Sequence, residues 1–506
     1  MAIGHARREF LKTVGAAAGA ALGLPFSRIS SAQSAPSAKR PRNILFLMCD
    51  QHRPDALGRY GDPYALTPSL DALAASGMSF RQNYTQNPIC VPARNSILMG
   101  RYCHSTGALS NGFGSRLDLT TIPQLLRSKG YRTACFGKLH VKGRNDLDWD
   151  EVSEGGAKRG PAPAGAVILE TRLSGRQPVG AASPFSEEET NEWAAMEKAI
   201  AFMKANRDRP WFLQCSMYKP HPPFQPPKRY WDVIDRSKLE IPRYPEDDLD
   251  DTPKRYWEGM VGRQMDNLTD DQVRDGMQGY YGNLAFADAM IGEVLKALDD
   301  LGLRQDTLVV YTADHGEMLY DHRLWTKMVF FDPSVRVALI LSCRGLIPAG
   351  RETKALTEHI DLFPTFMDLL GFETPESVQG LSLVPLLTGA KDTHHDVVFS
   401  EHYFKAGDQE QAARMIFDGR YKYIDNGPDD TPELYDQQTD PREIVNLVRQ
   451  PEQRARVQSM AERLRQWASR DVVEPQSRKE AKKGRSQGKK GGGKGKETGG
   501  EAAEDD

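Results

Sequence analysis

The sequence predicts an α/β fold in which a large, mostly parallel sheet is sandwiched by helices and is followed by a smaller C-terminal α+β subdomain. Two observations predict it. From residue 41 onward, short apolar runs alternate with helical patterns. After about residue 389 this alternation gives way to shorter strands and one final helix. With 506 residues, 39% hydrophobic and 27% charged, the chain is long enough to bury a large core.

The strands of the predicted parallel sheet are uninterrupted apolar runs, which are typical of strands buried on both faces. They are expected at residues 43–49, 132–136, 211–217, 307–312 and 335–342. Parallel strands need long crossover connections, which are usually helical. Helices are therefore expected between these runs.

Three of the expected helices carry start or stop signals. One has Pro68 in its first turn and Gly77 as its terminator. A second is expected to begin with a capping box at residues 186–189. The third has apolar residues at helical spacing between residues 284 and 298 and is expected to end near Gly302.

The smaller subdomain is expected at residues 390–470, after a catalytic domain at residues 40–389. The dipeptide Asp418-Gly419 is a hairpin signal between two of its strands. Apolar residues at helical spacing between residues 457 and 467 predict the final helix. The subdomain strands are expected at residues 397–400, 414–417 and 421–424.

The last segment, residues 471–506, is rich in Lys and Gly and ends in acidic residues. It has too few apolar residues to bury and is expected to be disordered. A basic tail could contact a polyanion, but a solvated tail is the favoured interpretation.

Residues 1–34 are predicted to be an export signal peptide. Arg7 and Arg8 precede an apolar run at residues 14–24, and small residues follow at 30–32. The paired arginines resemble a twin-arginine signal, which implies the twin-arginine export machinery as a partner and a periplasmic or extracellular location. A short amphipathic helix or an uncleaved anchor is the alternative.

Composition excludes several other partners. The net charge of −3 gives no field that favours nucleic acid. No later apolar run approaches the roughly 20 residues of a membrane span, so no such span is expected in the mature chain.

Of the six cysteines, Cys49, Cys135 and Cys215 lie inside apolar runs and are expected to be buried thiols. The absence of a C-x-x-C pair argues against a structural zinc site.

Polar side chains follow four of the predicted strands. In open parallel sheets, ligands bind beyond the carboxyl ends of the strands. A single acid or histidine there is weak evidence of a site, because such residues are often helix caps or structural. Together the polar residues predict a site at one edge of the sheet, and they are Asp50, Gln51, Lys138, His140, His221, Asp314 and His315.

A fifth element adds a candidate nucleophile. Cys90 is followed by Pro92, Arg94 and a helical pattern, which predicts that the cysteine lies at a helix N-terminus. Backbone N–H groups and the helix dipole favour anions there. The planar fork of Arg94 suits an oxyanion. A free cysteine in a loop is the alternative.

These motifs resemble those of the sulfatases of the alkaline phosphatase superfamily. The resemblance runs from about residue 41 to 447 and rests on C-x-P-x-R, Gly-Lys-x-His and Pro-His-x-Pro-Phe segments at residues 90–94, 137–140 and 220–224. It implies an alkaline phosphatase-like fold. It also implies that a formylglycine-generating maturation enzyme oxidises Cys90 to formylglycine before folding. The hydrated aldehyde of such enzymes attacks sulfur, and the sulfated intermediate then releases sulfate.

The resemblance also implies roles for other residues. Lys138 would bind the ester, and His140 would assist elimination. His221 would lie near the leaving-group oxygen, and Lys327 would grip the sulfate. Arg94 matches the arginine of the family motif.

A divalent metal is implied at Asp50, Gln51, the modified Cys90, Asp314 and His315. The Asp-Gln and Asp-His pairs look more like the branch that contains choline sulfatase-like proteins and phosphonate monoester hydrolases. Oxygen ligands favour Ca²⁺. An imidazole and one fewer carboxylate make Mn²⁺ the alternative.

The function predicted from these residues is the hydrolysis of a small or polymeric sulfate ester. Phosphonate monoester or phosphodiester hydrolysis by the same machinery is the runner-up, because both substrates present a singly charged tetrahedral centre. A catalytically silent binding protein is a remote alternative, because a binder needs no formylglycine precursor such as Cys90. Residues 146–183 have no readable pattern, so choline, aryl and carbohydrate sulfates all remain open as substrates.

Overall fold

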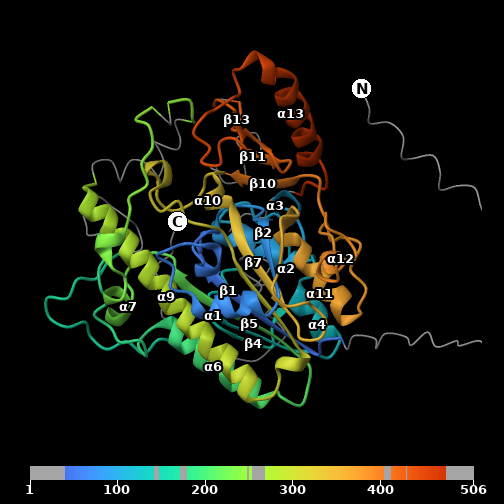
Figure 1. The fold of residues 1–506 in the computed structure, drawn as a ribbon. Coiled ribbons are helices and arrows are strands. Elements are labelled where there is room, and N and C mark those ends of the chain that lie inside the picture. Colours follow the sequence, from blue (N-terminus) through green and yellow to red (C-terminus); the bar gives the residue numbers. More distant parts are fainter. Residues whose placement is uncertain are drawn as a thin grey trace, which may run out of the picture. The chain divides into compact units, whose positions relative to one another are not determined.

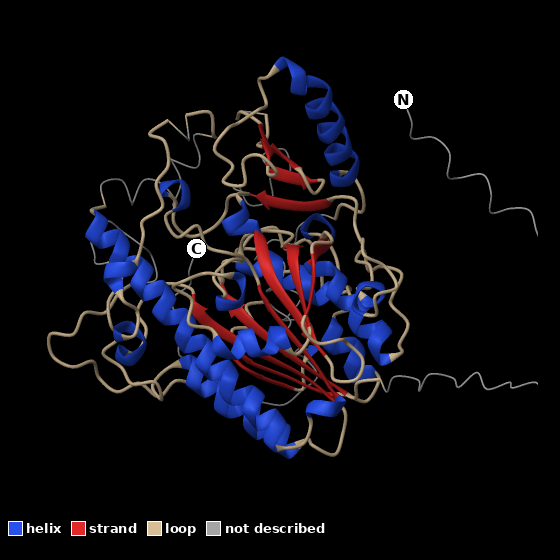
Figure 2. Ribbon diagram, viewed as in Figure 1, coloured by secondary structure: helices blue, strands red, loops and turns tan. Residues whose placement is uncertain are grey.

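The computed structural model describes residues 40–141, 148–170, 179–247, 250–253, 268–403, 412–428 and 430–473, all within one compact unit. These residues form a nine-stranded sheet flanked by helices and a separate four-stranded sheet (Figures 1 and 2). The predicted fold class is thereby confirmed. The predicted signal peptide and nearly all of the predicted tail lie outside the described residues. The predicted boundary at residue 389 stays a prediction.

The central sheet has the strand order β4-β3-β5-β1-β6-β7-β2-β8, and β9 also pairs with β2. The strands β4, β3, β5, β1 and β6 are parallel, whereas β7 is antiparallel to β6 and to β2. All five predicted strands are present, and β2, β4, β8 and β9 were not predicted. The bounds are β1 Asn43–Asp50, β2 Met78–Tyr84, β3 Arg132–Gly137, β4 Glu151–Ser153, β5 Trp211–Pro220, β6 Thr307–Ala313, β7 Arg336–Ser342, β8 Arg351–Thr353 and β9 Thr357–Glu358.

Strand β1 shows why the sheet is covered on both faces. All eight of its residues are buried, and successive side chains point to opposite faces. Leu45 and Leu47 pack in one apolar cluster with α1 (Pro68–Ala75), α6 (Asn191–Ala205) and α9 (Asp270–Asp300). Ile44 and Phe46 pack in another with α2 (Cys90–Met99), α4 (Ile122–Ser128) and α11 (Leu362–Leu370). Each fully buried side chain of this kind stabilises the fold by about 1.5–3 kcal/mol.

The predicted capping box at residues 186–189 is not the start of a helix. Helix α6 begins at Asn191, and the hydroxyl of Thr190 caps it by accepting a hydrogen bond from the N–H of Trp193. Residues 186–189 close a turn instead, in which Glu189 accepts from the N–H of Ser186 at 3.0 Å. Thr190, which lies closer to the apolar residues of the helix, is the cap instead.

The second sheet has the order β10-β11-β12-β13 and is antiparallel throughout. Its strands are Val398–Tyr403, Ala412–Phe417, Tyr421–Asp425 and Glu433–Asp436. Helix α13 (Arg454–Ala468) packs Leu464 and Trp467 on Ile416 and Leu434 of this sheet. The predicted strands, hairpin and final helix of the subdomain are therefore present. The remaining α-helices within the described residues are α3 Cys103–Thr106, α7 Lys228–Asp232, α10 Asp332–Val335 and α12 Val384–Leu387.

All six cysteines lie in the described segments, and each is a buried thiol outside any disulfide. This confirms the expectation for Cys49, Cys135 and Cys215. Among the helices that the structure describes, none combines the length and the apolar character that a membrane crossing requires.

Candidate active site

The carboxyl ends of four neighbouring parallel strands bring the predicted residues to one edge of the central sheet. Asp50 is the last residue of β1, and Asp314 directly follows β6. Lys138 directly follows β3, and His221 directly follows β5. The N–H of His221 donates to the carbonyl of Asp50 at 3.2 Å, so adjacent strand ends are also bonded to each other. The residues that follow these strand ends therefore lie at one edge of the sheet, as the carboxyl-end rule predicts.

Cys90 is the first residue of α2, a helix whose ten residues are all buried. Its Sγ lies 3.2 Å from Nε2 of His315, 3.7 Å from Oδ1 of Asp50 and 3.7 Å from Nζ of Lys138. Burial and Asp50 oppose ionisation, but Lys138, Lys327 and His315 outweigh them and lower the pKa of the thiol to about 5. The position therefore stabilises an anion on residue 90.

Arg94 lies one turn further along α2 and bridges the strand ends. Its Nε is 2.8 Å from Oδ2 of Asp314, and its Nη2 is 3.1 Å from Oδ2 of Asp50. Its Nη1 donates to the carbonyl of Lys138 and to the hydroxyl of Ser216. The guanidinium is 1% exposed, and every nitrogen is bonded, so it holds both carboxylates in fixed orientations.

Donor atoms of Asp50, Cys90, Asp314 and His315 all lie within 4.8 Å of one another. The Nδ1 of His315 lies 3.0 Å from the carbonyl of Gly316, which can only accept. Nδ1 therefore donates in either protonation state, and Nε2 faces the cluster, where it can bind a metal once its proton is lost. Burial lowers the pKa of His315, but Asp314 and Cys90 outweigh it and raise this pKa above its usual value.

The charges in this cluster suit a divalent cation. Burial raises the pKa of Asp50, but the positive charges of Lys138 and Arg94 hold it well below its usual range. The carboxylate is therefore ionised, as a metal ligand must be. Two fixed carboxylates and one imidazole lone pair fit a cation that accepts oxygen and nitrogen ligands.

Gln51 connects the cluster to Lys327. It has a positive φ of 67°, and its N–H donates to Oδ1 of Asp314 at 3.1 Å. Its side-chain oxygen accepts from Nζ of Lys327 at 2.6 Å, and its Nε2 donates to Glu317. Lys327 is 9% exposed. The predicted Lys327 and Gln51 therefore lie together beside the carboxylates.

The two predicted histidines differ in their surroundings. Burial, Lys327 and Lys138 lower the pKa of His221 well below 6.5, so its imidazole is neutral at pH 7. The Nδ1 of His221 donates to the carbonyl of Pro222 at 2.7 Å, which leaves Nε2 as the atom with a free lone pair. The backbone N–H of His140 donates to Glu154 at 2.6 Å, and its Nδ1 is buried with no hydrogen-bond partner among the described residues.

Two residues of this site were not predicted. Ser216 is a buried polar residue inside the apolar strand β5, and it accepts from Arg94 at 3.0 Å. Glu317 is fully buried and accepts from the backbone N–H groups of Leu319 and Thr326. A polar residue within an apolar run was the available signal for Ser216. Glu317 lies two residues after His315, but nothing in its spacing distinguishes it from a surface acid.

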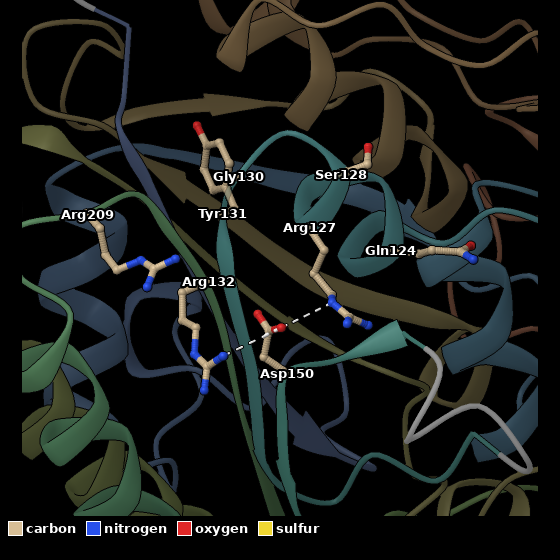
Figure 3. Close-up of a pocket in the computed structure, with 8 residues that line it drawn as sticks. All are labelled: Gln124, Arg127, Ser128, Gly130, Tyr131, Arg132, Asp150 and Arg209. Atoms are coloured by element: carbon tan, nitrogen blue, oxygen red, sulfur yellow. Dashed lines mark ion pairs between the residues drawn. The ribbon is translucent and has the colours of Figure 1, made fainter. Parts of the chain in front are cut away.

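A separate cavity of about 440 Å³ contains none of the predicted residues. It lies where β3 begins, at Arg132, whereas Lys138 follows the other end of that strand. Figure 3 shows Arg127 and Arg132 directed at Asp150, with nitrogen–oxygen distances of 3.1 and 3.6 Å. The remaining lining residues are Gln124, Ser128, Gly130, Tyr131 and Arg209. This cavity is therefore not the candidate active site.

Two family models match the chain. The model described as Sulfatase matches residues 42–372. The model described as N-sulphoglucosamine sulphohydrolase, C-terminal, matches residues 320–470.

Curated relatives and solved structures extend this comparison. A choline-sulfatase from Rhizobium meliloti (strain 1021) is 29% identical over 431 residues, which are 81% of this chain and 83% of the relative. An arylsulfatase from Clostridium perfringens (strain 13 / Type A) is 27% identical over 452 residues, which are 82% of this chain and 92% of the relative. Among solved structures, a phosphonate monoester hydrolase from Silicibacter pomeroyi is 28% identical, with a TM-score of 0.73 over 86% of this chain and 96% of that chain.

Proposed function

The chain belongs to the sulfatase family, and from this premise we propose that it hydrolyses sulfate esters with a nucleophile made by oxidation of Cys90. It is a sulfuric ester hydrolase with an alkaline phosphatase-like fold. The observation that carries the proposed nucleophile is the environment of Cys90, at a buried helix N-terminus within 4.8 Å of two carboxylates and an imidazole. A purely structural role as a small apolar side chain does not explain a thiol that is buried among charged groups.

The proposed modification changes the donor atom at residue 90 from sulfur to oxygen. Formylglycine at this position would supply a hydrated aldehyde, whose hydroxyl is an oxygen nucleophile. Around it, Lys138 and Lys327 present positive charge for the sulfate group. Nε2 of His221 is available to hold or release a proton. We propose His140, with its unbonded Nδ1, as the second proton carrier.

We propose that Asp50, Gln51, Asp314, His315 and the modified residue 90 hold one divalent metal. A cation at this position would neutralise negative charge on the reacting ester. Ca²⁺ is the proposed ion because most of the donors are oxygens, and Mn²⁺ is the alternative because of the imidazole. Metal analysis of the purified protein after dialysis against each ion tests the choice.

The experiment that tests the nucleophile is mass spectrometry of the peptide that contains residue 90. The protein is produced with and without a formylglycine-generating enzyme, and each preparation is assayed on an aryl sulfate. Activity should rise in proportion to the fraction of residue 90 that is converted. Full activity in protein whose Cys90 is an unmodified thiol would contradict the proposal.

Phosphonate monoester hydrolysis is the second candidate. The structural likeness to the Silicibacter pomeroyi enzyme, at 28% identity and a TM-score of 0.73, favours it. Sulfate monoesters and phosphonate monoesters carry the same single charge on a tetrahedral centre. The ratio of kcat/KM on an aryl sulfate and an aryl phosphonate monoester, measured with the same aryl group, distinguishes the two activities.

We further propose that residues 1–34 direct export through the twin-arginine machinery to the periplasm or beyond, and that a formylglycine-generating enzyme modifies Cys90 before export. Replacement of Arg7 and Arg8 by Lys should leave the precursor in the cytoplasm. Fractionation of cells that express this variant tests the proposal, and unimpaired export would contradict the twin-arginine interpretation.

A further inference from the structure

A second cluster of metal-binding side chains lies apart from Cys90. Asp361 ends the short helix η5 (His359–Asp361), and His394 and His395 precede strand β10. One donor atom of each residue lies within 4.8 Å of the other two. Asp361 is fully buried, and the side chains of the two histidines are only 6% and 14% exposed. The cluster shares no residue with the candidate active site.

The distances between these donor atoms fit a single bound ion. Nε2 of His394 lies 3.2 Å from Oδ2 of Asp361. Nε2 of His395 lies 3.0 Å from both carboxylate oxygens. Ligands about 2.0 Å from a tetrahedral Zn²⁺ are separated by roughly 3.3 Å, so small outward shifts of the rings would accommodate the ion.

The surrounding backbone holds the Asp361 carboxylate in place. Its Oδ1 accepts from the N–H of Leu381 at 2.8 Å, and its Oδ2 accepts from the N–H of Glu358 at 2.9 Å. Such outer contacts orient metal ligands in proteins. The carboxylate is therefore fixed independently of the two histidines.

Glu358 lies beside the cluster, outside the three residues whose donor atoms lie within 4.8 Å of one another, and would move closer to become a fourth ligand. Its Oε2 lies 3.9 Å from Nε2 of His395 and accepts from the hydroxyl of Tyr102 at 2.7 Å. Its Oε1 accepts from the N–H of Phe399 at 2.7 Å. Glu358 is fully buried, like Asp361.

The charges of the cluster are compatible with a bound cation, which would take the place of protons. Burial lowers the pKa of His395, but Asp361 outweighs it and raises this pKa to about 9, and burial raises the pKa of Glu358 to about 7. In the described part of the chain, no Lys or Arg forms an ion pair with Asp361 or Glu358, and the ion pairs of these two acids are with His394 and His395. A divalent cation would neutralise both carboxylates while the imidazoles stay neutral.

We propose that Asp361, His394 and His395, with Glu358 as a fourth ligand, form a structural site for a divalent transition metal of the Zn²⁺ class. Two imidazoles and two carboxylates suit Zn²⁺ better than Ca²⁺, which prefers oxygen alone. The ion would link the edge of the central sheet, where Glu358 ends β9, to the segment that enters the second sheet.

The test compares the full-length protein with His394→Gln/His395→Gln. The amide N–H of glutamine can still donate to Asp361, so this variant retains hydrogen bonding but loses the imidazole ligands. After chelator treatment and dialysis, zinc is titrated in, and bound metal and Tm are measured. The wild type should bind one more equivalent of Zn²⁺ than the variant, and Zn²⁺ should raise the Tm of the wild type by several degrees more.

Asp392→Asn, which removes an exposed carboxylate of the same segment, is the matched control and should behave as the wild type. Co²⁺ provides a second readout, because a tetrahedral site gives it visible absorption that the double variant should lack. Equal zinc binding by the wild type and the double variant would overturn the proposal. If the double variant fails to fold, His395→Cys should keep the ion and add thiolate-to-cobalt absorption. Absence of that absorption would overturn the proposal equally.

Discussion

Arg94 and Asp314 form a buried ion pair in which Nε and Oδ2 are 2.8 Å apart and both side chains are at most 1% exposed. The same guanidinium reaches Asp50 at 3.1 Å, so one helix residue orients acids from the ends of two strands. Removing one member of a buried pair leaves the other charge uncompensated. We therefore expect each of these acids to affect both the proposed metal site and the local fold.

Asp314→Asn should weaken metal binding and activity together, because it removes a formal charge from the proposed ligand set. The measurement is metal content after dialysis, with kcat/KM determined on the same sample. Glu373→Gln, which changes an exposed acid, serves as the control for the loss of one negative charge. A fully metal-loaded and active Asp314→Asn protein would contradict the proposed ligand set.

Cys90→Ser should lower steady-state turnover by more than about a thousandfold, as loss of a catalytic nucleophile does. Serine offers one oxygen, so it can accept the sulfuryl group but cannot expel sulfate by collapse to an aldehyde. Mass spectrometry should find at most one sulfate per chain on the introduced serine. Cys90→Ala is the control that can accept none. Sustained turnover by Cys90→Ser would refute the mechanism.

His221→Gln should lower kcat about 10²- to 10⁴-fold on an alkyl sulfate, because a proton carrier near the leaving-group oxygen is lost. The loss should shrink on nitrophenyl sulfate, whose leaving group needs little protonation. Rates across a series of leaving groups, with Tm as a check on folding, provide the measurement. An equal loss on all esters would assign His221 another role.

Lys422→Met should destabilise the fold by about 3–5 kcal/mol, the cost of breaking a buried ion pair. Nζ of Lys422 lies 2.7 Å from Asp332 and 2.6 Å from Glu443, and its side chain is fully buried. Lys422 belongs to the second sheet, whereas Asp332 begins α10. The free energy of unfolding in urea at pH 7 is the measurement. A change in the free energy of unfolding below 1 kcal/mol would show that the cluster of Lys422, Asp332 and Glu443 does not hold the second sheet and α10 together.

Acid unfolding should report on the same cluster. Burial raises the pKa of Asp332, but Lys422 and Arg336 outweigh it and hold the pKa well below its usual range. A carboxyl group with a lowered pKa in the folded state adds stability above about pH 4, and this stability is lost as the pH falls through the folded-state pKa. In Lys422→Met, the loss of stability below about pH 4 should therefore be smaller than in the wild type. Urea unfolding at pH 7, 4 and 3 provides the test.

Much of the central sheet could be predicted because its strands are buried on both faces. Such strands are apolar throughout, as β1 and β6 are, and they stand out from the helices between them. Strand β2 was missed because Arg81 and Gln82 interrupt its apolar character near the edge of the sheet. The antiparallel direction of β7 is defined by its pairing with β6 and β2, and the sequence of β7 itself does not indicate it.

The candidate site followed from the same rule, because parallel strands deliver their carboxyl ends to one edge. Contacts between side chains could not be predicted in this way. Arg94 was expected to offer a fork to an oxyanion, and nothing in its motif reveals that its nitrogens are bonded to Asp50, Asp314 and Ser216. The cysteine spacing argued against structural zinc, but it carries no information on a site built from Asp361 and two histidines.

Because all six thiols are buried and unpaired, the proposed conversion of Cys90 can be measured by counting thiols. A thiol reagent added to the native protein should react slowly, because every sulfhydryl is shielded. In denaturant the unmodified chain should titrate as six equivalents, and each conversion at Cys90 should remove one of them. Since no sulfur is tied up in a disulfide, the count needs no reductant. The number of thiols per chain would then give the fraction of chains in which Cys90 is converted, before any substrate is known.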